Sequence, residues 1–127
     1  MIVLCDGVFD PLHIGHVRYL QKAATYGHVV VRVAPDEAIV AKGRTPLQTR
    51  AERLVMLEAL RVVTAVHDDE TLAGAVQRLR PNFLAKGSDW RDKLPDDVVR
   101  ACYRYHIPIV FTETVARTSS ERLRATS

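Results

Sequence analysis

The sequence predicts an α/β fold in which one doubly wound sheet of five parallel strands carries helices on both faces. Three observations lead to this prediction. Short apolar runs typical of buried strands recur along the chain, and stretches of helical periodicity separate them. This alternation is the pattern of consecutive strand-helix-strand units. The chain contains no repeat, low-complexity tract or linker, and its 127 residues fit one domain.

The apolar runs and the periodic stretches define the expected elements. Strands are predicted at residues 2–5, 29–34, 62–66, 83–85 and 107–111. Helices are predicted at residues 14–25, 51–60, 71–79 and 96–105, and again in the tail from residue 118. The first helix is expected to end at Gly27 as its C-terminal cap, and Pro81 is expected to stop the third. Residues 41–49 and 86–94 are expected to be loops.

A sheet of this Rossmann-like kind binds its ligands at the carboxyl ends of the strands, near the switch in strand order. The loops to search are therefore those that follow Cys5, Ala34, Val66, Ala85 and Phe111. The loop after Cys5 is the most informative of them.

That first loop has the composition of a phosphate site. Gly7 follows the strand directly, which favours a tight turn with exposed N–H groups. His13 and His16 are three residues apart and share one face at the start of the next helix, where the helix dipole favours an anion. Gly15 between them leaves room for a phosphate. The alternative interpretation is that both histidines only cap the helix, whereas zinc would need further ligands.

Residues 7–16 read Gly-Val-Phe-Asp-Pro-Leu-His-Ile-Gly-His. This run resembles the Gly-x-Phe-Asp-x-x-His-x-Gly-His motif of the cytidylyltransferase-like branch of the nucleotidylyltransferase superfamily. Three further segments resemble motifs of that family in the same order, at residues 53–57, 86–90 and 117–120. The resemblance covers almost the whole chain. Among its branches, it is closest to the adenylyltransferase domain of the ADP-heptose synthases and to the glycerol-3-phosphate cytidylyltransferases.

The resemblance implies one nucleotidyltransferase domain over residues 1–127, without a kinase portion. A substrate phosphate would attack the α-phosphorus of a nucleoside triphosphate in line, and pyrophosphate would leave. The acceptor would be a sugar phosphate or a polyol phosphate. A magnesium ion (Mg2+) bridging the phosphates is implied by the chemistry, and family habit implies a homodimer.

The resemblance also implies roles for particular residues. His13 and His16 would hold the triphosphate, Lys42 would neutralise charge there, and Arg53 would hold a phosphate of the substrate or of pyrophosphate. Asp89 would meet the ribose hydroxyls. The expected nucleotide-binding residues are Gly7, Val8, Phe9, Gly15, Lys86, Gly87, Asp89, Arg117, Thr118 and Ser119.

Each of these residues also has a purely structural interpretation. Lys42 and Arg44 would then be solvated loop charges, and Arg53 would make an ordinary ion pair on its helix. Lys86 and Gly87 would form a turn, and residues 118–120 an N-cap run. Trp90 fits packing and a contact to the base equally well.

The motifs favour ATP over CTP, so the transferred group would be AMP rather than CMP. Residues 86–89, Lys-Gly-Ser-Asp, resemble the adenylyl loop, and residues 42–46 resemble the loop of the heptose enzymes. Trp90 matches the cytidylyl loop better, and Val8 replaces the commoner Thr or Ser of the family. Two other functions stay open: an adenylyltransferase for a phosphorylated vitamin precursor, and a nucleotide-binding regulator without turnover.

The composition of the chain limits the classes of partner that it is expected to bind. The net charge of +3 suits an anionic small molecule, whereas nucleic acid is not favoured because basic residues are spread along the chain. No segment is apolar enough for a membrane span, and the first residues do not form a signal peptide. Cys5 and Cys102 suggest neither a disulfide framework nor a zinc site. We therefore expect a cytoplasmic protein.

Overall fold

A computed structural model describes residues 1–68 and 71–112 of the chain, and it contains one sheet of five parallel strands. The strands are β1 (Ile2–Gly7), β2 (His28–Val33), β3 (Val63–His67), β4 (Phe83–Gly87) and β5 (Ile109–Thr112). Every pairing is parallel, and the strand order is β3-β2-β1-β4-β5. The predicted fold class is confirmed, and each predicted strand is present with its bounds shifted by a few residues.

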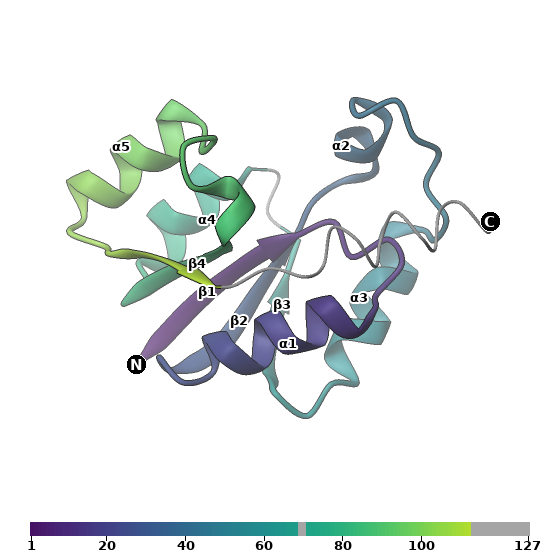
Figure 1. Cartoon of the computed structure of the whole chain (residues 1–127), viewed down its shortest axis with the longest axis horizontal. Helices are drawn as coiled ribbons and strands as arrows, with labels where there is room; N and C mark the ends of the chain where they lie inside the picture. Colours follow the sequence, from purple (N-terminus) through teal and green to yellow (C-terminus); the bar gives the residue numbers. More distant parts are fainter. Residues whose placement is uncertain (69–70, 113–127) are drawn as a thin grey trace.

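Helices cover both faces of this sheet (Figure 1). The helices of the described residues are α1 (Ile14–Ala23), α2 (Asp36–Val40), α3 (Arg50–Glu58), α4 (Leu72–Leu79), α5 (Asp96–Arg104) and the short 3-10 helix η1 (Ser88–Trp90). In Figure 1, α1 and α3 lie on one side of the strands, and α4 and α5 lie on the other.

The hydrophobic core has two parts, one on each face of the sheet. Val3 of β1 packs with Leu20 of α1 and Leu57 of α3, whereas its neighbour Leu4 packs with Val76 of α4 on the opposite face. Successive side chains of a strand point to opposite faces. Both faces of this sheet are covered, so its central strands are apolar at successive positions over residues 2–5, 29–31 and 83–85, and this is why they were recognisable as continuous runs.

The strand order reverses at β1. The chain first builds outward from β1 through β2 to β3, and then returns to place β4 on the other side of β1. The carboxyl ends of β1 and β4 therefore lie side by side at the switch in strand order, where ligands of such sheets bind.

Gly27 does not have its predicted role as a helix cap, and that prediction was wrong. α1 already ends at Ala23, and its cap residue Ala24 keeps a right-handed helical conformation. A Cβ at Gly27 would lie 2.6 Å from the carbonyl oxygen of Met1. The glycine is needed because the turn before β2 runs directly against the start of the chain, where the backbone N–H of His28 donates to Met1.

Two short elements fall where no helix was expected. α2 begins directly after β2, with Asp36 and Glu37 in its first turn and Ile39 buried, and η1 lies inside the predicted loop at residues 86–94. Elements this short hold too few residues to display a helical period. The helix expected from residue 118 lies outside the described residues.

Candidate functional site

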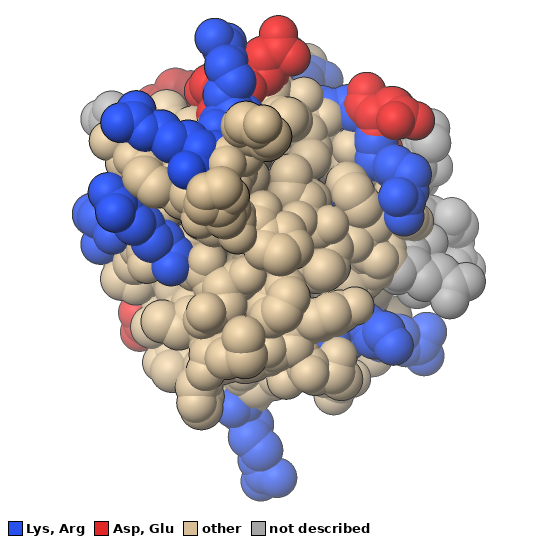
Figure 2. All heavy atoms as spheres, turned by 90° about the vertical axis from the view of Figure 1, so that its left-hand side faces the viewer, with Lys and Arg blue, Asp and Glu red and all other residues tan. Residues whose placement is uncertain are grey.

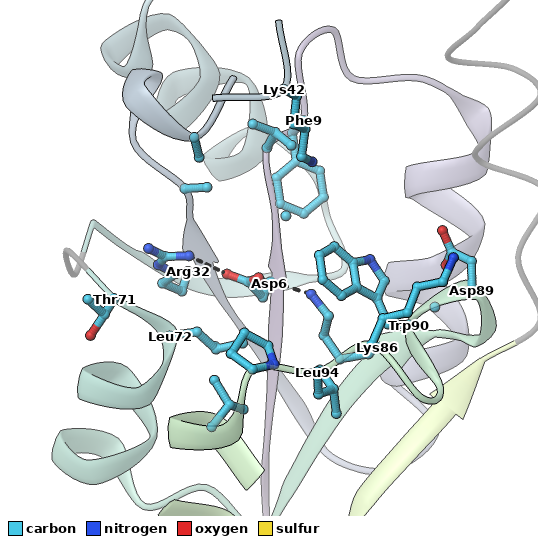
Figure 3. Close-up of a pocket in the computed structure, with 18 of the residues that line it drawn as sticks. Asp6, Phe9, Arg32, Lys42, Thr71, Leu72, Lys86, Asp89, Trp90 and Leu94 are labelled. Carbon is cyan, nitrogen blue, oxygen red and sulfur yellow. Dashed lines mark hydrogen bonds and ion pairs between the residues drawn. The ribbon is translucent and has the colours of Figure 1, made fainter. Parts of the chain in front are cut away.

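A cleft of about 800 Å³ opens at the carboxyl ends of β1, β2 and β4 (Figure 3). Its walls come from the loop after β1, from α2 and the loop that follows it, from η1, and from the starts of α4 and α5. The charged side chains that line it are Arg32, Lys42, Arg44, Lys86 and Lys93 against Asp6, Asp89 and Asp97. Because cations exceed carboxylates in this lining, the cleft favours an anionic ligand.

The two histidines build the start of α1. His13 is the N-cap residue, and its Nδ1 accepts a hydrogen bond from the backbone N–H of Gly15 at 3.1 Å. In return, the Nδ1 of His16 accepts from the backbone N–H of His13 at 3.3 Å, which completes a capping box. The rings stack with their centroids 3.8 Å apart. Because each Nδ1 acts as an acceptor, each neutral ring carries its proton on Nε2.

These Nε2–H groups are the donors that the pair can offer to a ligand. His16 lines the cleft. The Nε2 of His13 is buried and has no hydrogen-bond partner among the described residues. Burial lowers the pKa of His13, and burial together with the charge of His13 lowers the pKa of His16 to about 3. At neutral pH both rings are therefore uncharged donors.

Phe9 sets the position of His16 from the side. Its backbone is left-handed, with φ of 53°, and its ring meets that of His16 edge-on with centroids 4.9 Å apart. The ring also lies over Gly7, where a Cβ would be 3.0 Å from it. Gly7 ends β1, paired with Val33, so its smallness makes room for Phe9.

Asp10 ties the loop at residues 41–49 to the loop after β1. Its buried carboxylate accepts hydrogen bonds from the backbone N–H groups of Leu47, at 2.8 Å, and Gln48, at 2.7 Å. Lys42 and Arg44 line the cleft from the same loop. No separate role was predicted for Asp10, whose signal in the sequence was a carboxylate within an otherwise apolar part of the motif.

Arg53 lies behind the cleft and not on its lining. The side chain is buried, and its Nη1 donates to the carbonyl oxygens of Val8, at 2.8 Å, and Ala34, at 2.9 Å. Its Nη2 pairs with the carboxylate of Asp36. Arg53 therefore fastens the loops that follow β1 and β2 to α3.

The end of β4 brings Lys86 and Trp90 together. The Nζ of Lys86 lies 4.1 Å from the centroid of the Trp90 ring, within cation–π distance. The Nζ of Lys42 lies 6.0 Å from the same ring. Both lysines predicted for the site thus lie within cation–π range of Trp90, and Figure 3 shows Lys86 beside its ring.

A buried ion-pair row was missed by the sequence analysis. Asp6 lies between Arg32, whose Nη1 is 2.9 Å from one carboxylate oxygen, and Lys86, whose Nζ is 3.0 Å from the other. Burial alone would raise the pKa of Asp6, but the two cations outweigh it and hold that pKa below its ordinary value. The available signal was Arg32 itself, a charge inside a valine-rich strand that the fold buries.

The predicted residues divide into three groups. Those that line the cleft are Gly7, Val8, Phe9, His16, Lys42, Lys86, Gly87 and Asp89. His13, Gly15 and Arg53 are buried and are not part of the lining. Arg117, Thr118 and Ser119 lie outside the described residues.

The family model for cytidylyltransferase-like proteins matches residues 4–125. The chain belongs to the cytidylyltransferase-like family. By family, it is a nucleotidyltransferase. It is 41% identical over 103 residues to the bifunctional protein HldE of Geobacter metallireducens, covering 77% of this chain and 20% of that protein. HldE of Campylobacter jejuni (strain RM1221) is 36% identical over 98 residues, which are 73% of this chain and 21% of the relative. The match thus spans about a fifth of the length of these relatives.

Solved structures share the fold of this cytidylyltransferase-like chain. The lipopolysaccharide core biosynthesis protein of Thermoplasma volcanium GSS1 superposes with a TM-score of 0.72 at 24% identity, covering 89% of this chain and 97% of that one. A protein of unknown function from Archaeoglobus fulgidus gives a TM-score of 0.68 at 17% identity, covering 89% and 90%.

The described residues of this nucleotidyltransferase contain no group of three His, Cys, Asp or Glu side chains placed to hold a metal ion. Mg2+ is commonly held by one or two carboxylates together with substrate phosphates and water. Asp89 and Asp97 are carboxylates of the lining suited to such a contact. Within the same residues, no helix is long and apolar enough to cross a membrane.

Proposed function

We propose that this nucleotidyltransferase moves a nucleoside monophosphate, AMP in preference to CMP, from a nucleoside triphosphate to a sugar phosphate or polyol phosphate. Pyrophosphate is the second product. The observation that carries the proposal is the histidine pair: its Nδ1 atoms are used within the protein, His16 lines a cleft with an excess of cations, and the Nε2 of His13 is buried with no hydrogen-bond partner among the described residues.

In this reaction the protein does not supply the nucleophile; it positions the substrates and stabilises charge. The acceptor's phosphate oxygen forms the new bond to the α-phosphorus while the bond to pyrophosphate breaks. Such a transfer is accelerated by holding the reacting groups in line and by stabilising the charge on the phosphoryl oxygens. The Nε2–H of His16, with Lys42 and Arg44 from the facing loop, is suited to that task.

The residues outside the lining have supporting roles in this proposal. Arg53 and Asp10 act as positioning residues, since one holds the carbonyl oxygen of Val8 and the other holds the loop that carries Lys42. Asp89 or Asp97 would hold Mg2+, which would supply positive charge to neutralise the phosphates. Arg117, Thr118 and Ser119 stay in the proposal on the strength of the resemblance alone.

The preference for AMP rests on the run Lys-Gly-Ser-Asp at residues 86–89, which resembles the adenylyl form of this loop. Calorimetric titration with ATP and with CTP, each with magnesium, tests it. We expect ATP to bind more tightly. A tenfold preference for CTP, about 1.4 kcal/mol, would contradict the choice of base and point to a polyol phosphate as acceptor.

Pyrophosphate release tests the transfer itself. The purified chain is incubated with the preferred nucleotide and a panel of sugar phosphates, polyol phosphates and phosphorylated vitamin precursors. We expect release with a member of the first two groups. Pyrophosphate release only with a vitamin precursor would show that the acceptor belongs to that class instead. Nucleotide binding without pyrophosphate release across the panel would count against a transfer reaction.

A further inference from the structure

The ion-pair row lies where the apolar core of the sheet stops. On the face covered by α4 and α5, neighbouring side chains of β2, β1 and β4 form a core row that packs against those helices. Two residues further along each strand, the same face carries charged side chains. The core row is Val30, Leu4 and Leu84, and the charged row is Arg32, Asp6 and Lys86.

The charged row is held rigidly. Its side chains are 8%, 10% and 4% exposed for Arg32, Asp6 and Lys86. Tyr19 holds the backbone of two of the three strands, β1 and β4: its hydroxyl accepts from the N–H of Asp6 and donates to the carbonyl oxygen of Ala85. The three side chains thus form one preorganised unit in the floor of the cleft (Figure 3).

Stability gives no reason for this row to be charged. Burying an ion pair costs desolvation that the attraction between the partners often only balances, so apolar side chains of similar volume would serve the fold as well. The row places two cations beside one carboxylate at the cleft. An arginine fork and an ammonium group on one wall of a cleft are the donors that suit a phosphate.

The row faces the histidine pair across the carboxyl edge of the sheet. α1, which starts at the histidines, packs on the face formed by Val3 and Cys5, and the row lies on the opposite face. His16 and the row nevertheless line the same cleft. In an in-line transfer the attacking and leaving oxygens lie on opposite sides of the phosphorus. Donors on the two faces of the sheet are therefore suited to two different phosphate groups, one of the nucleotide and one of the acceptor.

We infer that Arg32 and Lys86, held in place by Asp6, bind the phosphate group of the acceptor, a phosphate monoester, while the histidine pair holds the nucleotide. The inference rests on the proposed function. It moves Lys86 from the nucleotide to the acceptor, and it makes Arg32 a determinant of acceptor specificity.

The test uses inorganic phosphate as the probe. The chain is saturated with magnesium and α,β-methylene ATP, or its cytidine analogue if CTP binds better, so that the nucleotide subsites are filled and no transfer occurs. Phosphate is then titrated by calorimetry. We expect binding to the parent, and at least tenfold weaker binding to Arg32→Gln and to Lys86→Met, with the affinity for the nucleotide analogue changed less than threefold. The matched controls Arg61→Gln and Lys22→Met, both exposed and away from the lining, should behave as the parent.

Three results would overturn the inference: no phosphate binding to the loaded parent, unchanged phosphate binding in Arg32→Gln, or an equal loss of nucleotide affinity in the variants. If Arg32→Gln does not fold, Arg32→Lys keeps the charge but loses the planar fork, and we expect about threefold weaker phosphate binding. Failure of the parent to bind either nucleotide would instead refute the proposed function. Phosphate titration of the unloaded chain and the same variants would then still decide whether the row binds phosphate.

Discussion

Each imidazole of the histidine pair has two nitrogen atoms with separate tasks. One nitrogen of each ring is used to cap α1, and the other remains a donor. The two interpretations that the sequence left open, helix capping and phosphate binding, are therefore compatible. Sequence spacing placed both rings at the start of a helix, but it contains no information about which ring nitrogen is used.

We predict that His16→Ala loses most activity and still folds. Removing one preorganised donor at a reacting phosphate lowers the rate by about 10²–10³, whereas the lost cap contributes only about 1 kcal/mol to stability. Steady-state pyrophosphate release is compared between the variant, the parent and His28→Ala, which changes an exposed histidine at the start of β2. Activity of the His16 variant within about threefold of the parent would contradict the assignment.

The low pKa of His16 predicts how stability depends on pH. Its pKa is about 3 in the folded chain and about 6.5 when unfolded, so between these values the unfolded state binds the extra proton. The contribution to the free energy of unfolding is complete above about pH 6.5 and is lost as the pH falls toward 3. At pH 5 the loss is about 2 kcal/mol.

Urea unfolding at pH 7.5 and pH 5.0 measures this loss. His16→Gln is the comparison, because glutamine at this position of a capping box accepts the same backbone hydrogen bond and does not titrate. The parent should lose more stability than the variant on acidification. Equal losses in both proteins would show that His16 titrates normally in the folded chain.

At the scale of elements, the loops around the cleft are fixed by buried polar side chains that reach from one element to another. Arg53 of α3 reaches two loops, and Asp10 reaches the loop before α3. The strands and the longer helices were predictable because their apolar periods are local. The role of Gly27 could not be predicted, because it depends on Met1, which precedes the neighbouring strand. The partner of Arg32 could not be predicted either, because Asp6 is on another strand.

We predict that Arg53→Leu destabilises the chain by at least about 2 kcal/mol, since the buried carbonyl oxygens of Val8 and Ala34 lose their donor. Urea unfolding measures the change, and Glu58→Gln, an exposed position at the end of the same helix, is the control. A variant with parental stability and no activity would instead favour the phosphate contact that the family resemblance implies for Arg53.

At the scale of the whole molecule, the charged cleft and the outer surface differ in how charged side chains are distributed. Figure 2 shows the side of the molecule on which α5 lies in Figure 1, and uncharged side chains fill its centre while Lys and Arg lie toward its rim. Among the described residues drawn in this view, Lys and Arg do not form a continuous stripe. α5 exposes Val99 and Tyr103, the latter 86% accessible, one helical turn apart.

We predict that the chain forms a homodimer. Exposed apolar side chains on α5 favour association with a second copy, as does the family habit. Light scattering should give about twice the 14.2 kDa of one chain. The double variant Val99→Lys, Tyr103→Lys should shift the mass toward one chain. A parent mass of one chain at working concentration would refute the prediction, and a variant that stays dimeric would place the interface elsewhere.

Trp90 is the single tryptophan of the chain, and its ring lies within 4.1 Å of one lysine ammonium group and 6.0 Å of another at the cleft. The energy of indole emission depends on the electric field across the ring. An anion that enters the cleft and binds these ammonium groups changes that field. The protein therefore carries its own optical probe: the emission of an unlabelled sample should shift as the cleft fills, and occupancy becomes readable in real time without a coupled assay.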